Sequence, residues 1–103
     1  MLINNIIYFN KSLDKFNHKN YIKMNNKTKY ENVFIKCFSI KKDVLKKKDL
    51  KYNTIDKWDS VGHMSMIGKL EDTFNITFEM DDIIDFSSFN KGIKILKKYK
   101  VII

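Results

Sequence analysis

Residues 58–74 read WDSVGHMSMIGKLEDTF, and this stretch decides the fold. Its apolar residues recur at three- and four-residue spacing, the period of an amphipathic helix, and we expect them to be buried. They are Val61, Met64, Ile67, Leu70 and Phe74, with Met66 expected on the more exposed side. Asp59 is a favourable N-cap, so Ser60 would lie in the first turn. The pattern therefore predicts a helix that begins at Ser60.

The segment before this helix predicts another helix and then a long loop. Apolar residues at spacing i, i+3, i+4, i+7 and i+8 form one helical stripe that ends near Ile40. They are Tyr30, Val33, Phe34, Cys37 and Phe38. Residues 41–57 are polar and lysine-rich, with single apolar residues. We expect a loop there that contacts the core at intervals, and a loop of this length usually has a function.

The segment after it predicts two more helices. Residues 80–86 indicate one or two helical turns, and Ser87 or Ser88 can cap a last helix. The buried face of that helix would comprise Phe89, Ile93, Leu96 and Tyr99. No segment alternates polar and apolar residues over a useful length. We therefore expect an all-α fold, a small four-helix bundle with a long loop between its first two helices and a short third helix.

Length and composition set further bounds. The 103 residues suit one small domain, which we place at residues 29–103, after a basic, asparagine-rich and flexible extension at residues 1–28. Apolar runs of about four residues are too short for a membrane span or a secretory signal. The single cysteine, Cys37, excludes an internal disulfide and a cysteine-based zinc site. We expect a cytoplasmic protein.

The charge is unevenly distributed. The net charge is +8, and all 20 basic residues are lysines. Arginine is the usual reader of guanine edges, so its absence weakens a nucleic-acid interpretation. Residues 59–85 instead carry seven acids against Lys69 alone, a local net charge of −6. Acidic faces attract basic partners and speed their encounter.

Ser60 does not have the surroundings of a hydrolytic nucleophile. Only His18 and His63 are available as bases, and the Gly-x-Ser-x-Gly pattern is absent. We therefore expect no enzyme, no catalytic residue and no metal site. His63 is expected on the surface, and Trp58 as a packed anchor of the loop or as a partner contact. Gly62 is either a tolerated helix glycine or a point where a partner or a bound group can approach closely.

The string Trp58-Asp59-Ser60-Val61-Gly62-His63-Met64 and the helices around it resemble the acyl carrier and peptidyl carrier family, which binds phosphopantetheine. The resemblance covers residues 29–100, about 70% of the chain. It implies that Ser60 carries a covalent 4′-phosphopantetheine taken from coenzyme A. Acyl or aminoacyl groups would travel on this arm as thioesters.

The resemblance also implies roles and partners. Asp59 would lie at the contact with the phosphopantetheinyl transferase (holo-carrier synthase) that modifies Ser60. Residues expected to contact partners are Trp58, Val61, Met64, Glu71 and Asp72. Further partners would be an acyl- or aminoacyl-activating ligase and an acyltransferase or ketosynthase, acting with a monomeric carrier. The Trp-Asp-Ser-x-Gly-His start favours a dedicated pathway over core fatty acid biosynthesis.

Two alternatives remain open at the level of sequence. A nucleic-acid-binding module would use a lysine cluster near Tyr52, namely Lys41, Lys42, Lys46, Lys47, Lys48 and Lys51. A helical interaction module would use Ser60 only as a helix cap.

Overall fold

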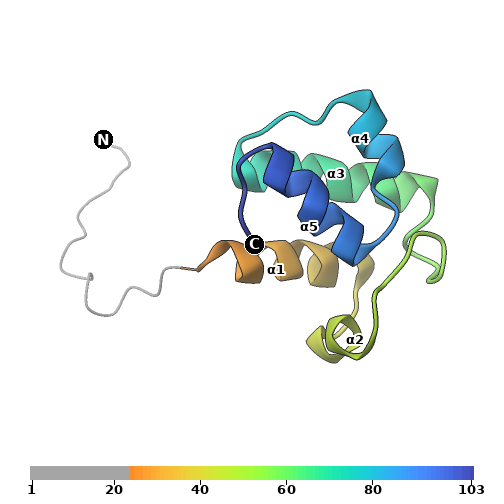
Figure 1. Cartoon of the computed structure of the whole chain (residues 1–103). Helices are drawn as coiled ribbons and strands as arrows, with labels where there is room; N and C mark the ends of the chain where they lie inside the picture. The colour runs from red at the N-terminus through yellow and green to blue at the C-terminus, as the bar shows by residue number, and fades with distance from the viewer. Residues whose placement is uncertain (1–23) are drawn as a thin grey trace, which may run out of the picture.

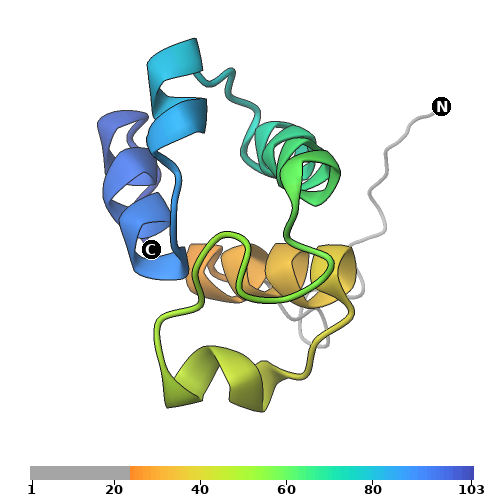
Figure 2. The same ribbon diagram turned by 90° about the vertical axis from the view of Figure 1, so that its right-hand side faces the viewer.

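The computed structural model describes residues 24–103, which form five helices and no strand. The helices are α1 (Asn26–Phe38), α2 (Lys42–Lys47), α3 (Ser60–Phe74), α4 (Met80–Asp85) and α5 (Phe89–Lys98). Helices α3, α4 and α5 lie on one side of α1, and α2 lies on the other (Figures 1 and 2). The expected small helical bundle is confirmed for this part of the chain. Residues 1–23 of the expected extension lie outside it.

Helix α1 follows the predicted stripe but begins earlier than the boundary at residue 29. Its N-cap is Asn25, whose side chain accepts a hydrogen bond from the amide of Thr28 at 2.8 Å. Its C-cap is Ser39, which adopts the left-handed conformation with φ of 53°. The predicted face is buried in the core except for Cys37, which is partly exposed.

The prediction of a continuous loop over residues 41–57 is wrong for its first part. Helix α2 occupies Lys42–Lys47, so the bundle has five helices rather than four. The helix has six residues, and only Leu45 among them is buried. So short a helix is not stable by itself, and the burial of Leu45 against the core holds it in place.

The rest of the loop is fixed by backbone hydrogen bonds to the segment before α5. The amide of Tyr52 donates to the carbonyl of Ser87 at 2.9 Å. The amide of Phe89 donates to the carbonyl of Leu50 at 2.8 Å. An isolated antiparallel bridge therefore joins the loop to this segment. It brings the lysine-rich connection close to the residues that cap α5.

Aromatic side chains fill the centre of the bundle, with Trp58 fully buried among them. Its indole stacks on Phe38 with ring centroids 5.1 Å apart and meets the edge of Phe34 at 5.4 Å. Such pairs stabilise beyond the area they bury. Trp58 precedes α3 by two residues, so this packing fixes where α3 begins.

Helix α5 closes the bundle against α1. Ser88 is its N-cap and accepts a hydrogen bond from the amide of Lys91 at 3.0 Å, as the sequence predicts. The hydroxyl of Tyr30 donates to the carbonyl of Phe89 at 2.6 Å. Burial, reinforced by the charge of Asp49, raises the pKa of Tyr30 well above 10.0, so the hydroxyl remains a donor.

None of the helices within residues 24–103 is both long enough and apolar enough to cross a membrane.

Candidate functional site

Ser60 is the first residue of α3, and its side chain is exposed. The Asp59 carboxylate caps the helix by accepting a hydrogen bond from the amide of Gly62 at 2.8 Å. The first four amides of a helix have no acceptor within it, and the helix dipole makes this end electropositive. The Asp59 carboxylate occupies the Gly62 amide, so the amides of Ser60 and Val61, together with the dipole, remain to favour an anion beside the Ser60 hydroxyl.

The fold itself requires a glycine at position 62. A Cβ atom at this position would lie 1.8 Å from the carbonyl oxygen of Lys57. The close approach seen at this glycine is made by the chain's own loop, whereas the sequence suggested approach by a partner or a bound group. It allows the backbone before Trp58 to turn directly into α3.

The buried face of α3 differs from the predicted stripe. Its fully buried residues are Met66, Ile67 and Leu70. Val61 and Met64 are instead 74% and 54% exposed, so the expectation that both are core residues is wrong, as is the expectation of an exposed Met66. The N-terminal turn of α3 consequently offers apolar side chains to solvent next to Ser60.

A cleft opens beside Ser60, between the start of α3 and α4. Its volume is about 400 Å³, and most of its lining is apolar. The lining residues are Tyr52, Ser60, His63, Met64, Met80, Ile83, Ile84, Phe86 and Ser87. A largely apolar cleft with a few polar groups is the usual form of a small-molecule site. The Ser60 hydroxyl lies at its wall.

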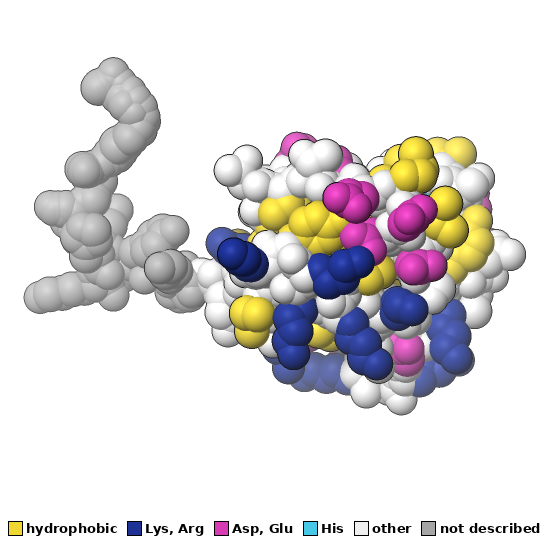
Figure 3. Space-filling model, turned by 45° about the horizontal axis from the view of Figure 1, so that its top comes forward, with side chains coloured by type: hydrophobic (Ala, Val, Ile, Leu, Met, Phe, Trp, Pro, Cys, Tyr) yellow, Lys and Arg dark blue, Asp and Glu magenta, His cyan; other side chains and the backbone are white. Residues whose placement is uncertain are grey.

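Exposed apolar side chains surround this cleft. Met80 and Ile84 of α4 are 69% and 70% exposed, and Val61 and Met64 face solvent on α3. Exposed apolar groups (yellow) lie beside acidic ones (magenta) in the upper half of the view in Figure 3, whereas lysines (blue) occupy the lower half. Exposed apolar side chains with charged neighbours are typical of an interaction surface. We call Val61, Met64, Met80 and Ile84 the apolar rim.

The acidic segment separates into structural and free carboxylates. Asp82 is buried and pairs with Lys98 at 2.6 Å, and it also accepts a hydrogen bond from the Tyr99 hydroxyl. Hydrogen bonds from Lys98 and then Tyr99 lower the pKa of Asp82 below 3.8. Asp81 and Asp85 of α4 are exposed next to the apolar rim.

Glu71 and Asp72, both predicted partner contacts, lie far from Ser60. They follow it by more than ten residues along α3, which corresponds to about 16–18 Å. The Glu71 carboxylate accepts a hydrogen bond from the amide of Phe78 at 2.9 Å and so holds the loop after α3. Asp72 is exposed. These two acids are not part of the surface around Ser60.

His63 is not the free surface residue that the sequence suggests. Its Nδ1 atom accepts a hydrogen bond from the indole Nε1–H of Trp58 at 2.9 Å. Its Nε2 atom lies 2.8 Å from the carbonyl oxygen of Ile83 in α4. Its ring also lines the cleft. His63 thus joins the core, the start of α3 and α4.

Trp58 acts as the packed anchor and is not accessible to a partner. It is fully buried, and its only polar group is occupied by His63. Of the predicted site residues, the structure brings together Ser60, Asp59, Val61 and Met64 at the start of α3, and leaves out Trp58, Glu71 and Asp72.

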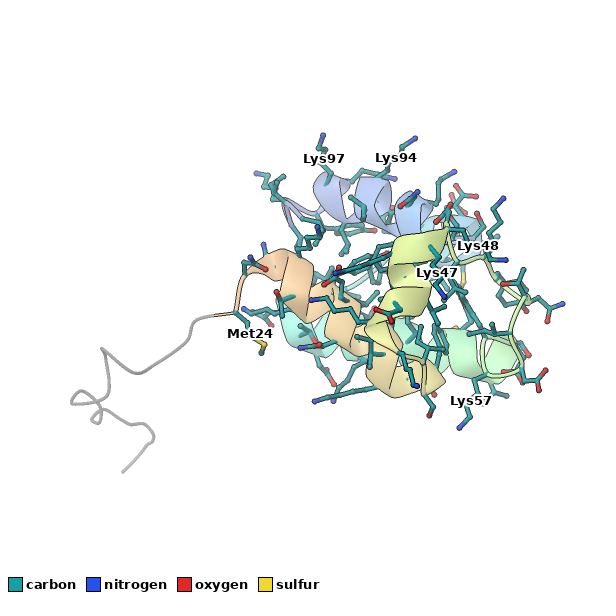
Figure 4. The ribbon with its side chains drawn as sticks, turned by 90° about the horizontal axis from the view of Figure 1, so that it is seen from below. Met24, Lys47, Lys48, Lys57, Lys94 and Lys97 are labelled. Carbon is teal, nitrogen blue, oxygen red and sulfur yellow. The ribbon has the colours of Figure 1, made fainter. Side chains whose placement is uncertain are left out.

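Tyr52, the aromatic residue nearest the lysine cluster, belongs in part to the cleft beside Ser60. Tyr52 lines the cleft and meets the edge of His63 with ring centroids 5.5 Å apart. Lys47 and Lys48 at the end of α2 and Lys94 and Lys97 on α5 are all exposed, and the last two point away from the bundle in Figure 4. The exposed lysines are spread over several elements and do not define one groove.

In the part of the chain that the structure describes, Cys37 and the acidic groups form no metal site. Burial raises the pKa of Cys37 above 9.0, so its thiol is not activated. Within residues 24–103 no three His, Cys, Asp or Glu side chains gather closely enough to hold a metal ion.

Reasoning from sequence missed most of the cleft. The lining comes from three separate segments that only the fold brings together, and it includes Tyr52, His63, Met80, Ile83, Ile84, Phe86 and Ser87. The one sequence signal was the apolar pair Met80 and Ile84, at four-residue spacing in an otherwise acidic turn.

A scan against protein-family models, a search of curated proteins and a search of solved structures give no significant match to this chain.

Proposed function

We propose that this chain is an acyl carrier protein that bears 4′-phosphopantetheine on Ser60 and has no turnover of its own. The observation that carries the proposal is the position of Ser60. It is exposed at the first residue of a capped 15-residue helix and opens on an apolar cleft of about 400 Å³. The bundle would then be of the acyl-carrier type, with α2 as an addition to its long loop.

Attachment requires only a hydroxyl that an enzyme can reach. The Ser60 Oγ atom attacks the phosphorus on the pantetheine side of the coenzyme A pyrophosphate. A new Oγ–P bond forms, the bond from that phosphorus to the bridging oxygen breaks, and adenosine 3′,5′-bisphosphate leaves. The hydroxyl proton passes to a base of the phosphopantetheinyl transferase. No residue of this chain has to act as that base, which fits the absence of an activating partner among the described residues near Ser60.

The surroundings of Ser60 fit the tethered group. The phosphodiester would lie at the N-terminus of α3, where free amides and the dipole favour an anion. The cleft offers Met64, Ile83 and Ile84 to the arm or to its cargo. When bound, the arm supplies a terminal thiol that forms thioesters with acyl or aminoacyl groups.

Partner enzymes would dock on the apolar rim and its acids. Val61 and Met64 on α3 lie beside Ser60, and Asp81 and Asp85 on α4 add negative charge. Methionine side chains adapt to several partner surfaces, which suits a carrier that visits a ligase and then an acyltransferase or ketosynthase. The pathway proposed here is a dedicated one, as the Trp-Asp-Ser-x-Gly-His start suggests.

The test is a modification assay with matched serine variants. The purified chain is incubated with coenzyme A, Mg²⁺ and a broadly specific phosphopantetheinyl transferase, and its intact mass is measured. We expect the wild type and Ser65→Ala to gain one phosphopantetheine, because Ser65 is an exposed α3 serine away from the helix end. Ser60→Ala should gain nothing. A wild type that stays unmodified while a control carrier is modified would refute the proposal.

A further inference from the structure

The two ring nitrogens of His63 have different and fixed roles. The indole nitrogen of Trp58 can only donate, so Nδ1 of His63 must accept and carries no proton. The carbonyl oxygen of Ile83 can only accept, so Nε2 carries the proton and donates. The neutral Nε2–H tautomer is therefore the form that satisfies both neighbours.

Helix α4 needs support from outside because it is short. It has six residues, and a helix of this length is not stable alone in water. Met80 and Ile84 point to solvent, so little of its apolar surface is packed. Polar contacts must therefore contribute to holding it.

Two polar anchors hold α4 from opposite sides. Asp82 binds Lys98 and Tyr99 at the C-terminal end of α5. The Ile83 carbonyl is one of the last four of α4, which have no partner within the helix, and it accepts the bond from His63. His63 thus acts as a C-terminal cap for α4 from across the cleft.

We propose that His63 is a positioning residue that sets the distance of α4 from Ser60 and so shapes the docking surface for the modifying enzyme. The effect of His63 on the modifying enzyme rests on the proposed function. Its effect on the position of α4 rests on the geometry alone. His63 does not touch the reacting atoms. It acts through α4, where Met80, Ile84, Asp81 and Asp85 lie.

The first measurement needs no variant. Long-range ¹H–¹⁵N spectra of the histidine rings should show the Nε2–H tautomer for His63. The chain has a single tryptophan, so one indole N–H signal reports the bond from Trp58 to Nδ1. An Nδ1–H tautomer for His63 would overturn the proposal.

The second measurement uses His63→Leu, which removes both hydrogen bonds, and His63→Gln, whose amide keeps one acceptor and one donor. In His63→Leu we expect backbone order parameters of α4 to fall from about 0.85 to below about 0.6. Those of α3 and α5 should not change, and the methyl signal of the buried Met66 should stay in place. His63→Gln should resemble the wild type. An unchanged α4 in His63→Leu, or equal loosening of all helices, would overturn the positioning role.

The third measurement separates docking from chemistry. In the transferase assay, His63→Leu should raise the KM for the carrier about tenfold, the factor for losing the hydrogen bond to the Ile83 carbonyl, with kcat within about twofold. His63→Gln should restore the KM. A loosened α4 with an unchanged KM would overturn the link to docking. A wild type that is not modified at all refutes the carrier function, while the spectra still decide whether His63 positions α4.

Discussion

The carboxylate of Asp82 lies 2.6 Å from the ammonium nitrogen of Lys98, although the Lys98 side chain is 63% exposed and that of Asp82 is 7% exposed. This pair joins α4 to the end of α5 and is completed by the Tyr99 hydroxyl. A buried carboxylate with two donors is a structural group, so it cannot also serve as a free docking charge.

Acid should weaken this anchor in a defined direction. The pKa of Asp82 is lowered in the folded chain by its hydrogen bonds to Lys98 and then Tyr99. Its contribution to the free energy of unfolding is therefore fully present above the unfolded pKa, near 3.8, and is lost as the pH falls through the lower folded pKa. Urea unfolding from pH 7 to pH 2 should show Asp82→Asn less stable at pH 7, with the difference shrinking below about pH 4.

Tyr99→Phe is the control for that experiment. It keeps the carboxylate and the Lys98 contact but removes the hydroxyl that donates to Asp82 and accepts from the Glu79 amide, and should cost about 1–2 kcal/mol at pH 7. If the free energies of unfolding of Asp82→Asn and the wild type differed by the same amount at all pH values, Asp82 would not be the source of the pH dependence.

Replacing the two glycines of α3 with alanine should change the stability of the chain in opposite directions. At Gly68 an added Cβ meets nothing within 4 Å, so Gly68→Ala should stabilise the chain by about 0.5–1 kcal/mol through helix propensity. At Gly62 the same atom would overlap the Lys57 carbonyl, so Gly62→Ala should destabilise by about 1–3 kcal/mol. Thermal unfolding of both variants tests this, and equal changes would refute the close approach.

Truncating the apolar rim should affect partners and not stability. Met64 is largely exposed, so Met64→Ala should change the free energy of unfolding by less than about 0.5 kcal/mol. Its effect should appear as a raised KM in the transferase assay. The matched core variant Ile67→Ala should lose about 2–5 kcal/mol because Ile67 is buried. A normal KM for Met64→Ala would remove Met64 from the docking surface.

The rate of thiol labelling should distinguish the chain that bears the phosphopantetheine arm from the unmodified chain. Burial raises the pKa of Cys37, so iodoacetamide at pH 7.5 should label it more slowly in the native chain than in urea. After modification of Ser60, a second and faster phase should appear from the exposed thiol of the arm. A single slow phase in a chain of modified mass would contradict attachment through that group.

A helix could be predicted from the sequence where its apolar residues fit only one helical face or where a capping residue precedes it. The stripe of Tyr30, Phe34 and Phe38 fits only one face of α1. Asp59 and Ser88 are polar residues directly before apolar periodic segments, so both caps followed from sequence.

The phase of α3 could not be settled locally. Apolar residues at positions 61, 64, 66, 67 and 70 support two overlapping stripes. The bundle buries Met66, Ile67 and Leu70. That choice depends on tertiary contacts, which periodicity does not contain. Helix α2 was not predicted for a related reason, because six residues with one buried side chain are too few to show a helical period.

The site was predictable at Ser60 and not beyond it. The hydroxyl and its cap are adjacent in sequence, whereas the cleft joins residues 52, 60–64 and 80–87. The role of His63 depends on a carbonyl 20 residues away, and no sequence pattern records such a bond.

The lysines of α2 lie on the opposite side of α1 from the carboxylates of α4, and this separation gives the molecule an electric dipole (Figures 1 and 2). In the field of a positively charged enzyme surface, such a body experiences a torque that turns its α4 side forward before contact. A chain with a net positive charge can thus approach a basic partner with its α4 side first. The advantage fades as added electrolyte shortens the Debye length to about 8 Å or less.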